Sequence, residues 1–177
     1  PVPGRRGSRT GVPYSDTWVM RIGEATAAPR IRLVCATHAG GSPDVFRAWR
    51  QAVAADVEML ALRLPGHGSR IKEHPYREWG RLVDDAFAAV SPYLERPHAF
   101  YGHSFGGRLV YELAVRAESA HPGLTTRLFL AGCRSPNRPQ RHPLMHTLPD
   151  SRFRAALRSM GGTPHEVLDR GLVMDRL

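Results

Sequence analysis

The stretch "FYGHSFGGRLVYEL", residues 100–113, decides the fold. It leaves an apolar, strand-like run, turns sharply around Ser104, and enters an amphipathic helix at once. "GHSFG" (102–106) fits G-x-S-x-G, in which a serine on a strained strand-to-helix turn holds its hydroxyl above a sheet. Glycines two residues to either side are needed because a side chain there would collide with the neighbouring strand and helix. The pattern predicts that Ser104 is a nucleophile, and the alternative is a tight turn with an idle serine.

Apolar runs alternate with amphipathic segments on both sides of this turn. The predicted strands are 31–37, 57–64, 98–104 and 127–133. The predicted helices are 43–54, with Ser42 as N-cap, then 76–94 and 105–119. Strand–helix–strand order repeated in this way is typical of an α/β domain, so we expect a mostly parallel sheet with helices on both faces.

The two ends of the chain differ from this middle part. Residues 1–16 are rich in Pro, Gly and Arg and lack the apolar stretch of a signal peptide, so we expect a disordered lead-in. Residues 17–177 form one domain in this interpretation. Its part from about 134 to 177 begins with a Pro-rich loop and continues with two short helices. Asp150 is expected to cap the first (151–160) and Thr163 to open a capping box for the second, and this region is predicted to form a lid over the edge of the sheet.

Composition excludes several classes of function. The 177 residues carry 25 Lys and Arg against 16 Asp and Glu, a net charge of +9. The arginines are scattered, without a stripe or interleaved aromatics, so we expect no nucleic-acid binding, although a basic surface suits an acidic partner. No run is long enough to span a membrane. Cys35 and Cys133 lie in apolar runs, which indicates buried thiols in the cytoplasm. We expect no cofactor, and no metal, because no ligand-like His or Cys spacing occurs.

A serine nucleophile needs donors for the oxyanion that forms on the attacked carbonyl. The backbone N–H of Phe105 begins the helix after Ser104 and is unpaired there. "CATHAGGS" (35–42) supplies a second loop after an earlier strand, and its glycines allow close backbone approach. We therefore predict the N–H of Ala39 as the second donor. The alternative for this loop is an ordinary strand-to-helix turn.

Four segments together resemble a known family. They are "VCATHAGGS" (34–42), "LRLPGHGSR" (62–70), "YGHSFGG" (101–107) and "PLMHTLPD…LRSMGGTPHEVLD" (143–169). In order and spacing they are similar to the type II thioesterases of polyketide and nonribosomal peptide assembly lines, over about residues 17–177. The resemblance implies an α/β-hydrolase fold and hydrolysis of misplaced acyl groups from the phosphopantetheine thiol of acyl or peptidyl carrier proteins, as an editing step in antibiotic biosynthesis.

The resemblance also implies roles for individual residues. Ser104 matches the nucleophile, and Ala39 and Phe105 match the residues whose backbone amides form the oxyanion hole. His103 matches a packing and positioning histidine. Residues 143–170 match the mobile cap that shapes the acyl pocket. The family usually has Met at the position of Phe105 and Ala at the position of Gly107, and neither difference removes the amide or the turn.

The catalytic acid and base are the main departure. In α/β-hydrolases they follow the nucleophile on loops after later strands, and family members continue beyond the equivalent of Leu177. Asp150 with His165 has the right order, but both fall in helix caps of the lid rather than after core strands. His146 lies in the Pro-rich loop without an acid placed to orient it, so we expect all three to be surface residues. We therefore expect a C-terminally truncated domain that lacks the last core strands and has impaired hydrolysis. Residues 127–133 should then be an edge strand with uncovered apolar side chains.

Two other functions stay open at this point. One is a non-catalytic remnant that binds carrier proteins, and the other is a generic α/β-hydrolase esterase acting on oxygen esters. Labelling of Ser104 by a fluorophosphonate separates the first from a thioesterase, and preference for oxygen esters over thioesters identifies the second.

Overall fold

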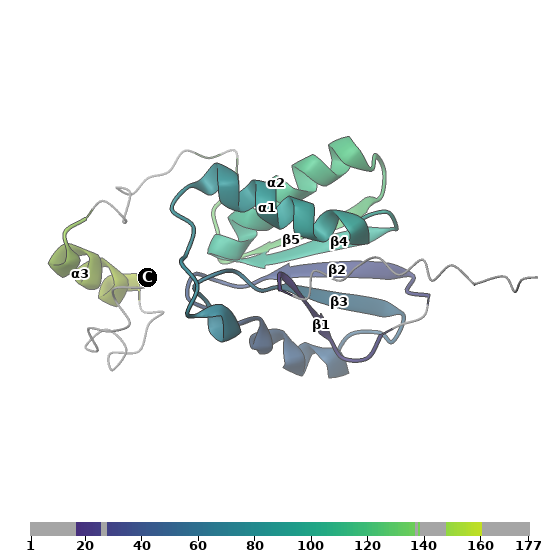
Figure 1. The fold of residues 1–177 in the computed structure, drawn as a ribbon, viewed down its shortest axis with the longest axis horizontal. Coiled ribbons are helices and arrows are strands. Elements are labelled where there is room, and N and C mark those ends of the chain that lie inside the picture. The colour runs from purple at the N-terminus through teal and green to yellow at the C-terminus, as the bar shows by residue number, and fades with distance from the viewer. Residues whose placement is uncertain (1–16, 26–27, 137, 139–147, 161–177) are drawn as a thin grey trace, which may run out of the picture.

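The described part of the chain forms a mixed sheet. The computed structural model describes residues 17–25, 28–136, 138 and 148–160. The strands are β1 (Val19–Ile22), β2 (Ile31–Ala36), β3 (Val57–Leu62), β4 (His98–His103) and β5 (Thr125–Ala131), in the spatial order β1-β3-β2-β4-β5 (Figure 1). Every described neighbouring pair is parallel except β1–β3. The predicted α/β class and mostly parallel sheet are confirmed.

Helices cover both faces of the sheet. The α-helices α1 (Trp79–Val90) and α2 (Phe105–Ala120) lie on one face, and the 3-10 helix η1 (Pro43–Gln51) lies on the other (Figure 1). The first face holds the larger core, in which buried side chains of the strands pack against those of both helices. The second core is smaller and is built around Phe46 of η1. Burial on both faces explains why the sequences of the inner strands β3 and β4 are mostly apolar.

The helix predicted at 43–54 is a 3-10 helix that ends at Gln51, so the predicted helix type is wrong. Ser42 caps it as expected, since its side chain accepts a hydrogen bond from the Asp44 N–H. With three residues per turn, Pro43 and Phe46 share one face and are buried. Val45, which an α-helical period places on that face, is 50% exposed.

The helix predicted at 76–94 is shorter than expected. α1 begins at Trp79 and ends at Val90, and a 3-10 turn, η3 (Ser91–Tyr93), follows. Pro92 explains the break, because proline has no N–H to donate and so cannot continue the α-helical hydrogen bonds. The helix predicted at 105–119 is α2 (Phe105–Ala120), which confirms that prediction.

The two outer strands differ in how well the sequence indicates them. β1 is a four-residue strand that sequence analysis missed, and it pairs with β3 in the register Val19↔Leu62. β5 is the other outer strand of the described sheet, and its Leu128 and Phe129 side chains are 36% and 50% exposed. The predicted edge position and uncovered apolar surface of this strand are confirmed.

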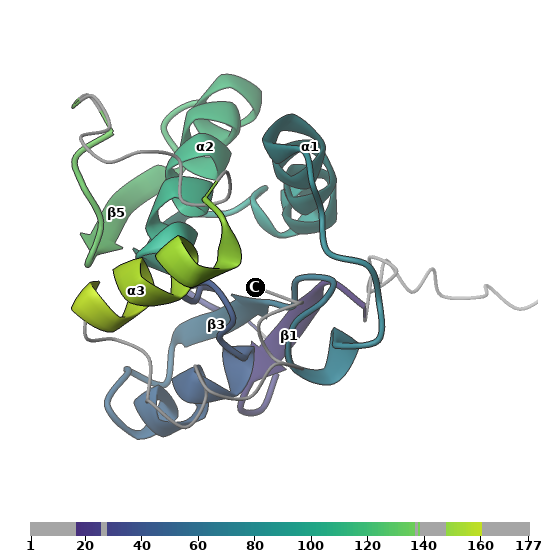
Figure 2. The ribbon, with the colours of Figure 1, turned by 90° about the vertical axis from the view of Figure 1, so that its left-hand side faces the viewer.

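The carboxyl ends of the parallel strands form one edge of the sheet, and α3 (Asp150–Met160) lies in front of that edge (Figure 2). Asp150 is the first residue of this helix rather than its cap, and that the region forms a lid stays a prediction. The predicted lead-in (1–16) and the helix predicted after Thr163 lie outside the described residues. Among the described helices, none has the length and apolar character required to cross a bilayer.

Candidate active site

The turn at Ser104 joins β4 directly to α2. Ser104 has φ 54° and ψ −114°, and it is the one non-glycine residue with a positive φ in the described part of the chain. Such a conformation is costly for a residue with a side chain and persists only where the surrounding structure holds it. The N–H of Ser104 donates to the carbonyl oxygen of Ala131 at 2.8 Å, which ties the turn to the end of β5. The predicted strained strand-to-helix turn is present.

The flanking glycines are required by close backbone contacts. A Cβ atom at Gly102 would lie 2.2 Å from the carbonyl oxygen of Gly106. One at Gly106 would lie 2.4 Å from the carbonyl oxygens of Ala36 and Thr37, at the end of β2. Real Cβ atoms do not approach backbone atoms so closely. The expected reason for glycine at both positions is therefore confirmed, and the start of α2 is pressed against the end of β2.

Gly107 is the position at which the family usually has alanine. A Cβ atom there would lie 2.5 Å from Cys133 Sγ. The Cys133 side chain, just after β5, therefore occupies the space that an alanine methyl group would need. The Cys133 side chain thus fills the space beside Gly107, and the turn stays closely packed without an alanine at that position.

Two loops that could hold an oxyanion lie at this edge. Phe105 is the first residue of α2, so its N–H has no acceptor within the helix. Ala39 lies in the loop after β2, where the N–H of Gly41 donates to the His38 carbonyl at 3.0 Å and closes a turn. Because Gly106 contacts the carbonyls that precede this loop, the two segments are neighbours. That the Phe105 and Ala39 amides converge on one oxyanion stays a prediction.

His103 precedes Ser104 and lies between two elements. Its ring is 5.6 Å from the ring of His38 in an edge-on arrangement. A Cβ atom at Gly132 would lie 2.6 Å from His103 Nε2, so the absence of a side chain at Gly132 leaves the space that the imidazole occupies. These contacts suit the packing and positioning role expected for His103. The same two histidines line a cavity of about 310 Å³, whose other lining residues are Thr37, Val45, Phe46, Trp49 and Tyr101.

An aromatic contact that sequence analysis missed links Ser104's neighbour to α1. The ring of Phe105 meets the ring of Trp79 edge-on at 5.5 Å between centroids. The guanidinium of Arg108 lies 5.7 Å from the centroid of the same indole. Trp79 lies within the helix predicted at 76–94. Its position in the sequence carries no signal for a contact with residue 105.

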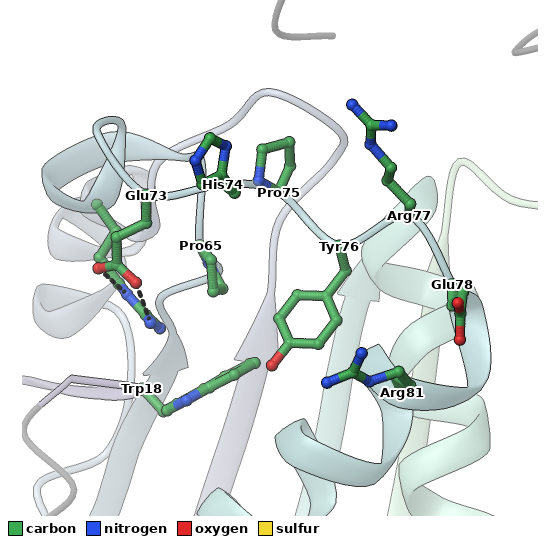
Figure 3. Close-up of a pocket in the computed structure, with 10 residues that line it drawn as sticks. Trp18, Pro65, Glu73, His74, Pro75, Tyr76, Arg77, Glu78 and Arg81 are labelled. Atoms are coloured by element: carbon green, nitrogen blue, oxygen red, sulfur yellow. Dashed lines mark hydrogen bonds and ion pairs between the residues drawn. The ribbon is translucent and has the colours of Figure 1, made fainter.

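A larger cavity, of about 670 Å³, lies beside the start of α1 (Figure 3). Its lining residues are Trp18, Pro65, Arg70, Glu73, His74, Pro75, Tyr76, Arg77, Glu78 and Arg81. Trp18 and Pro65 are near neighbours because β1 pairs with the end of β3. The cavity therefore lies at the same edge of the sheet as Ser104. Sequence analysis treated these arginines as scattered surface charges and did not predict a site here.

Two titratable groups in the core have shifted pKa values and lie apart from Ser104. Burial lowers the pKa of His98 at the start of β4, where Nε2 lies 2.9 Å from Thr125 Oγ1 and Nδ1 lies 2.9 Å from the Arg96 carbonyl. Burial raises the pKa of the Cys35 thiol to about 12. A thiol that stays protonated is a poor nucleophile. Both groups are structural; Cys35 is fully buried as predicted, whereas Cys133 is half-buried, and both are free thiols.

A base for Ser104 is not found among the described residues. In that part of the chain no hydrogen bond joins the Ser104 hydroxyl to a histidine or a carboxylate. His146 and His165, weighed as candidate bases, lie outside the described residues. Asp150 begins α3 in front of the strand ends, and its part in the chemistry stays untested.

Comparison with known proteins identifies a family. The model of the thioesterase domain matches residues 31–176. The chain is 38% identical over 152 residues to the AMB antimetabolite synthetase AmbE of Pseudomonas aeruginosa, covering 86% of this chain and 7% of that protein. It is 30% identical over 168 residues to the gramicidin S biosynthesis protein GrsT of Aneurinibacillus migulanus, covering 95% of this chain and 65% of that protein.

A solved structure gives the same result for the fold. The type II thioesterase BorB from the borrelidin biosynthetic cluster superposes with a TM-score of 0.74 at 31% identity, covering 92% of this chain and 66% of BorB. The chain thus spans less than two thirds of the length of each of these proteins.

Proposed function

The chain belongs to the thioesterase family, and from this membership we propose that it hydrolyses acyl thioesters through an acyl intermediate on Ser104. One observation carries the proposal. Ser104 is held with φ 54° at the junction of β4 and α2, at the edge where the parallel strands end. Open α/β sheets bind their ligands at this edge.

The proposed chemistry follows from the turn. The Ser104 oxygen attacks the thioester carbonyl and loses its proton to a base. The negative charge passes to the carbonyl oxygen, beside the N–H groups of Phe105 and Ala39. The carbon–sulfur bond then breaks, the thiolate takes up the proton, and water releases the acyl group from Ser104 in a second step of the same kind.

The substrate that we propose is the acyl or peptidyl group on the phosphopantetheine thiol of a carrier protein. The names of the relatives support this choice: AmbE is an antimetabolite synthetase, GrsT a gramicidin S biosynthesis protein, and BorB a type II thioesterase from the borrelidin biosynthetic cluster. The net charge of +9 favours an acidic partner. The free thiols Cys35 and Cys133 are in keeping with a cytoplasmic site of action.

The decisive test compares Ser104→Ala with Ser119→Ala. The second change removes an exposed hydroxyl from α2 whose one hydrogen bond within the described residues goes to the Val115 carbonyl. Release of free thiol from octanoyl-pantetheine measures turnover, and mass spectrometry after treatment with a fluorophosphonate measures acylation at serine. We expect Ser104→Ala to lower the hydrolysis rate at least about 1,000-fold and to abolish labelling. Ser119→Ala should behave as the parent chain. Equal rates for the two variants exclude Ser104 as the nucleophile.

A second function, binding of carrier protein without turnover, is favoured by one observation: in the described part of the chain no base contacts Ser104. A serine without a base loses most of its nucleophilicity, and the oxyanion donors alone leave only a residual rate. Saturable binding of an acyl carrier protein with no labelling of Ser104 supports this function. Full turnover that is lost in His146→Ala or His165→Ala contradicts it and identifies the base.

A further inference from the structure

The cavity beside α1 is lined by arginines that differ in how they are paired. Arg70 is fully engaged: it pairs with Glu73 through two short contacts of 2.6 and 2.7 Å and donates to the Arg63 carbonyl at 2.8 Å. Its guanidinium also lies 5.0 Å from the centroid of the Trp18 ring. By contrast, Arg77 and Arg81 have no ion pair or hydrogen bond with any of the described residues.

The cavity combines these cations with aromatic walls. Figure 3 shows Arg81 extending toward the ring of Tyr76, across from Trp18, whereas Arg77 stands at the rim. The rings of Trp18 and Tyr76 lie 5.9 Å apart. A hydrogen bond to Asp85 raises the pKa of Tyr76, and the positive charges of Arg81 and Arg70 act against that rise. Glu78 offsets one charge and leaves the lining with a net positive charge.

The first turn of α1 lies near both the cavity and the nucleophile turn. Arg81 is two residues beyond Trp79 on α1, the Trp79 ring meets the Phe105 ring at 5.5 Å, and Phe105 follows Ser104. A pantetheine arm has the length of four to five extended residues, roughly 15 Å. An arm of that length suits a ligand whose thioester lies at Ser104 and whose other end lies in the cavity.

We propose that this cavity is an anion subsite in which Arg81 and Arg77 bind the phosphate of the phosphopantetheine arm, while Trp18 and Tyr76 flank the pantoyl end. Guanidinium is the side-chain group best matched to phosphate oxygens, and this cavity provides two guanidiniums that have no partner within the described part of the chain. The inference rests on the proposed function for the identity of the arm. It adds the subsite, the residues that form it and the group that they recognise.

The test uses two substrates that differ only in the phosphate, octanoyl-phosphopantetheine and octanoyl-pantetheine. The parent chain should prefer the phosphorylated substrate about tenfold in kcat/KM, which corresponds to about 1.4 kcal/mol. Arg81→Gln should reduce that preference to near one, and Arg77→Gln should reduce it in part, because the loss in kcat/KM falls chiefly on octanoyl-phosphopantetheine. Arg127→Gln removes the same charge from an exposed position on β5 and should keep the preference. Added salt should weaken the preference in the parent chain, because exposed charges are screened.

Binding measured without turnover separates this inference from the proposed function. Calorimetric titration of the Ser104→Ala chain with phosphopantetheine and with pantetheine should show tighter binding of the former, lost in Arg81→Gln.

If neither thioester is hydrolysed but phosphopantetheine binds in this way, the proposed function fails and the subsite stands. Equal hydrolysis of both substrates, or equal losses on both in Arg81→Gln, overturns the subsite. A preference for intact carrier protein that depends on Arg81, with none for phosphopantetheine, assigns the arginines to carboxylates of the carrier and also overturns it.

Discussion

The two ends of the sheet use arginine in opposite ways. Near the start of β3, the carboxylate of Glu58 is 3% exposed and accepts from both Arg21 at 2.7 Å and Arg32 at 2.8 Å. At the carboxyl ends of the strands, Arg77 and Arg81 line a cavity and pair with none of the described residues.

Backbone conformation follows the same division. The strained Ser104 turn is at the carboxyl end, and the buried network of Glu58 with Arg21 and Arg32 is toward the amino end. Strain and unpaired charge both cost stability and are kept where a ligand can use them, whereas a satisfied ion network stabilises the fold. We therefore expect substitutions in the Glu58 network to change stability, and substitutions of Arg77 and Arg81 to change binding alone.

The largest expected effect tests the close packing of the turn at Ser104, at the carboxyl end of the sheet. Gly102→Ala puts a methyl group 2.2 Å from the Gly106 carbonyl oxygen, so the strand and the start of α2 must separate. We expect the free energy of unfolding, measured by urea denaturation, to fall by about 3 kcal/mol or more. Gly80→Ala is the matched control, because no atom lies within 4 Å of the added methyl group and alanine favours a helix. It should raise stability by about 0.5–1 kcal/mol. Equal stabilities of the two variants contradict the close packing of the turn.

The next effect breaks the ion network. Glu58→Gln removes the charge that Arg21 and Arg32 share, and both arginine side chains are partly exposed, at 21% and 18%. Water can therefore reach the freed guanidiniums, and we expect a loss of about 2 kcal/mol, below the range for fully buried pairs. Glu95→Gln removes an exposed carboxylate and should change stability by less than about 0.5 kcal/mol. If Glu58→Gln is as mild as this control, the amino end is not the stabilising one.

Most of the fold could be predicted from the sequence because its signals are local. The continuously apolar runs predicted the four main strands, and the G-x-S-x-G context predicted the Ser104 turn and the reason for Gly102 and Gly106. β1 was missed because four residues, one of them Arg21, give too short a pattern. The type of η1 was missed because a three-residue and a 3.6-residue period differ little over nine residues.

The site was predicted only in part, for the same physical reason. Ser104 and Phe105 are consecutive, so their relation follows from one turn. The cavity is different: Trp18 reaches it only because β1 pairs antiparallel with β3, and the contact of Trp79 with Phe105 depends on how α1 packs beside α2. These placements arise from tertiary packing, which local sequence patterns do not encode.

The buried His98, at the amino end of β4, should make the free energy of unfolding depend on pH. The pKa of His98 is lowered, chiefly by burial, with the charge of His121 acting in the same direction and that of Glu118 against it. The folded chain therefore holds His98 neutral, while the unfolded chain takes up its proton near the ordinary value of about 6.5. Stability should be full above pH 6.5 and fall as the pH drops from there toward the lower folded pKa, with a slope of at most about 1.4 kcal/mol per pH unit. Urea denaturation between pH 7.5 and 5 should show this slope in the parent chain and a smaller one in His98→Gln. An unchanged slope in the variant assigns the effect to other groups.

The smallest expected effect is also the most direct comparison of the two ends, because it makes the same substitution at each. Arg81→Gln removes a cation that has no partner among the described residues, in a chain with a net charge of +9. It should change the free energy of unfolding by less than about 0.5 kcal/mol, and a slight gain is expected from reduced self-repulsion.

Arg32→Gln is the counterpart at the amino end. Arg32 pairs with Glu58 and donates to the Tyr93 carbonyl at 2.9 Å, so this change leaves two buried acceptors with a poorer partner and should cost about 1–2 kcal/mol. Urea denaturation of the two variants side by side measures the difference. If Arg81→Gln lowers the free energy of unfolding as much as Arg32→Gln does, then Arg81 stabilises the fold. That result contradicts the inference that its guanidinium is available to bind an anion.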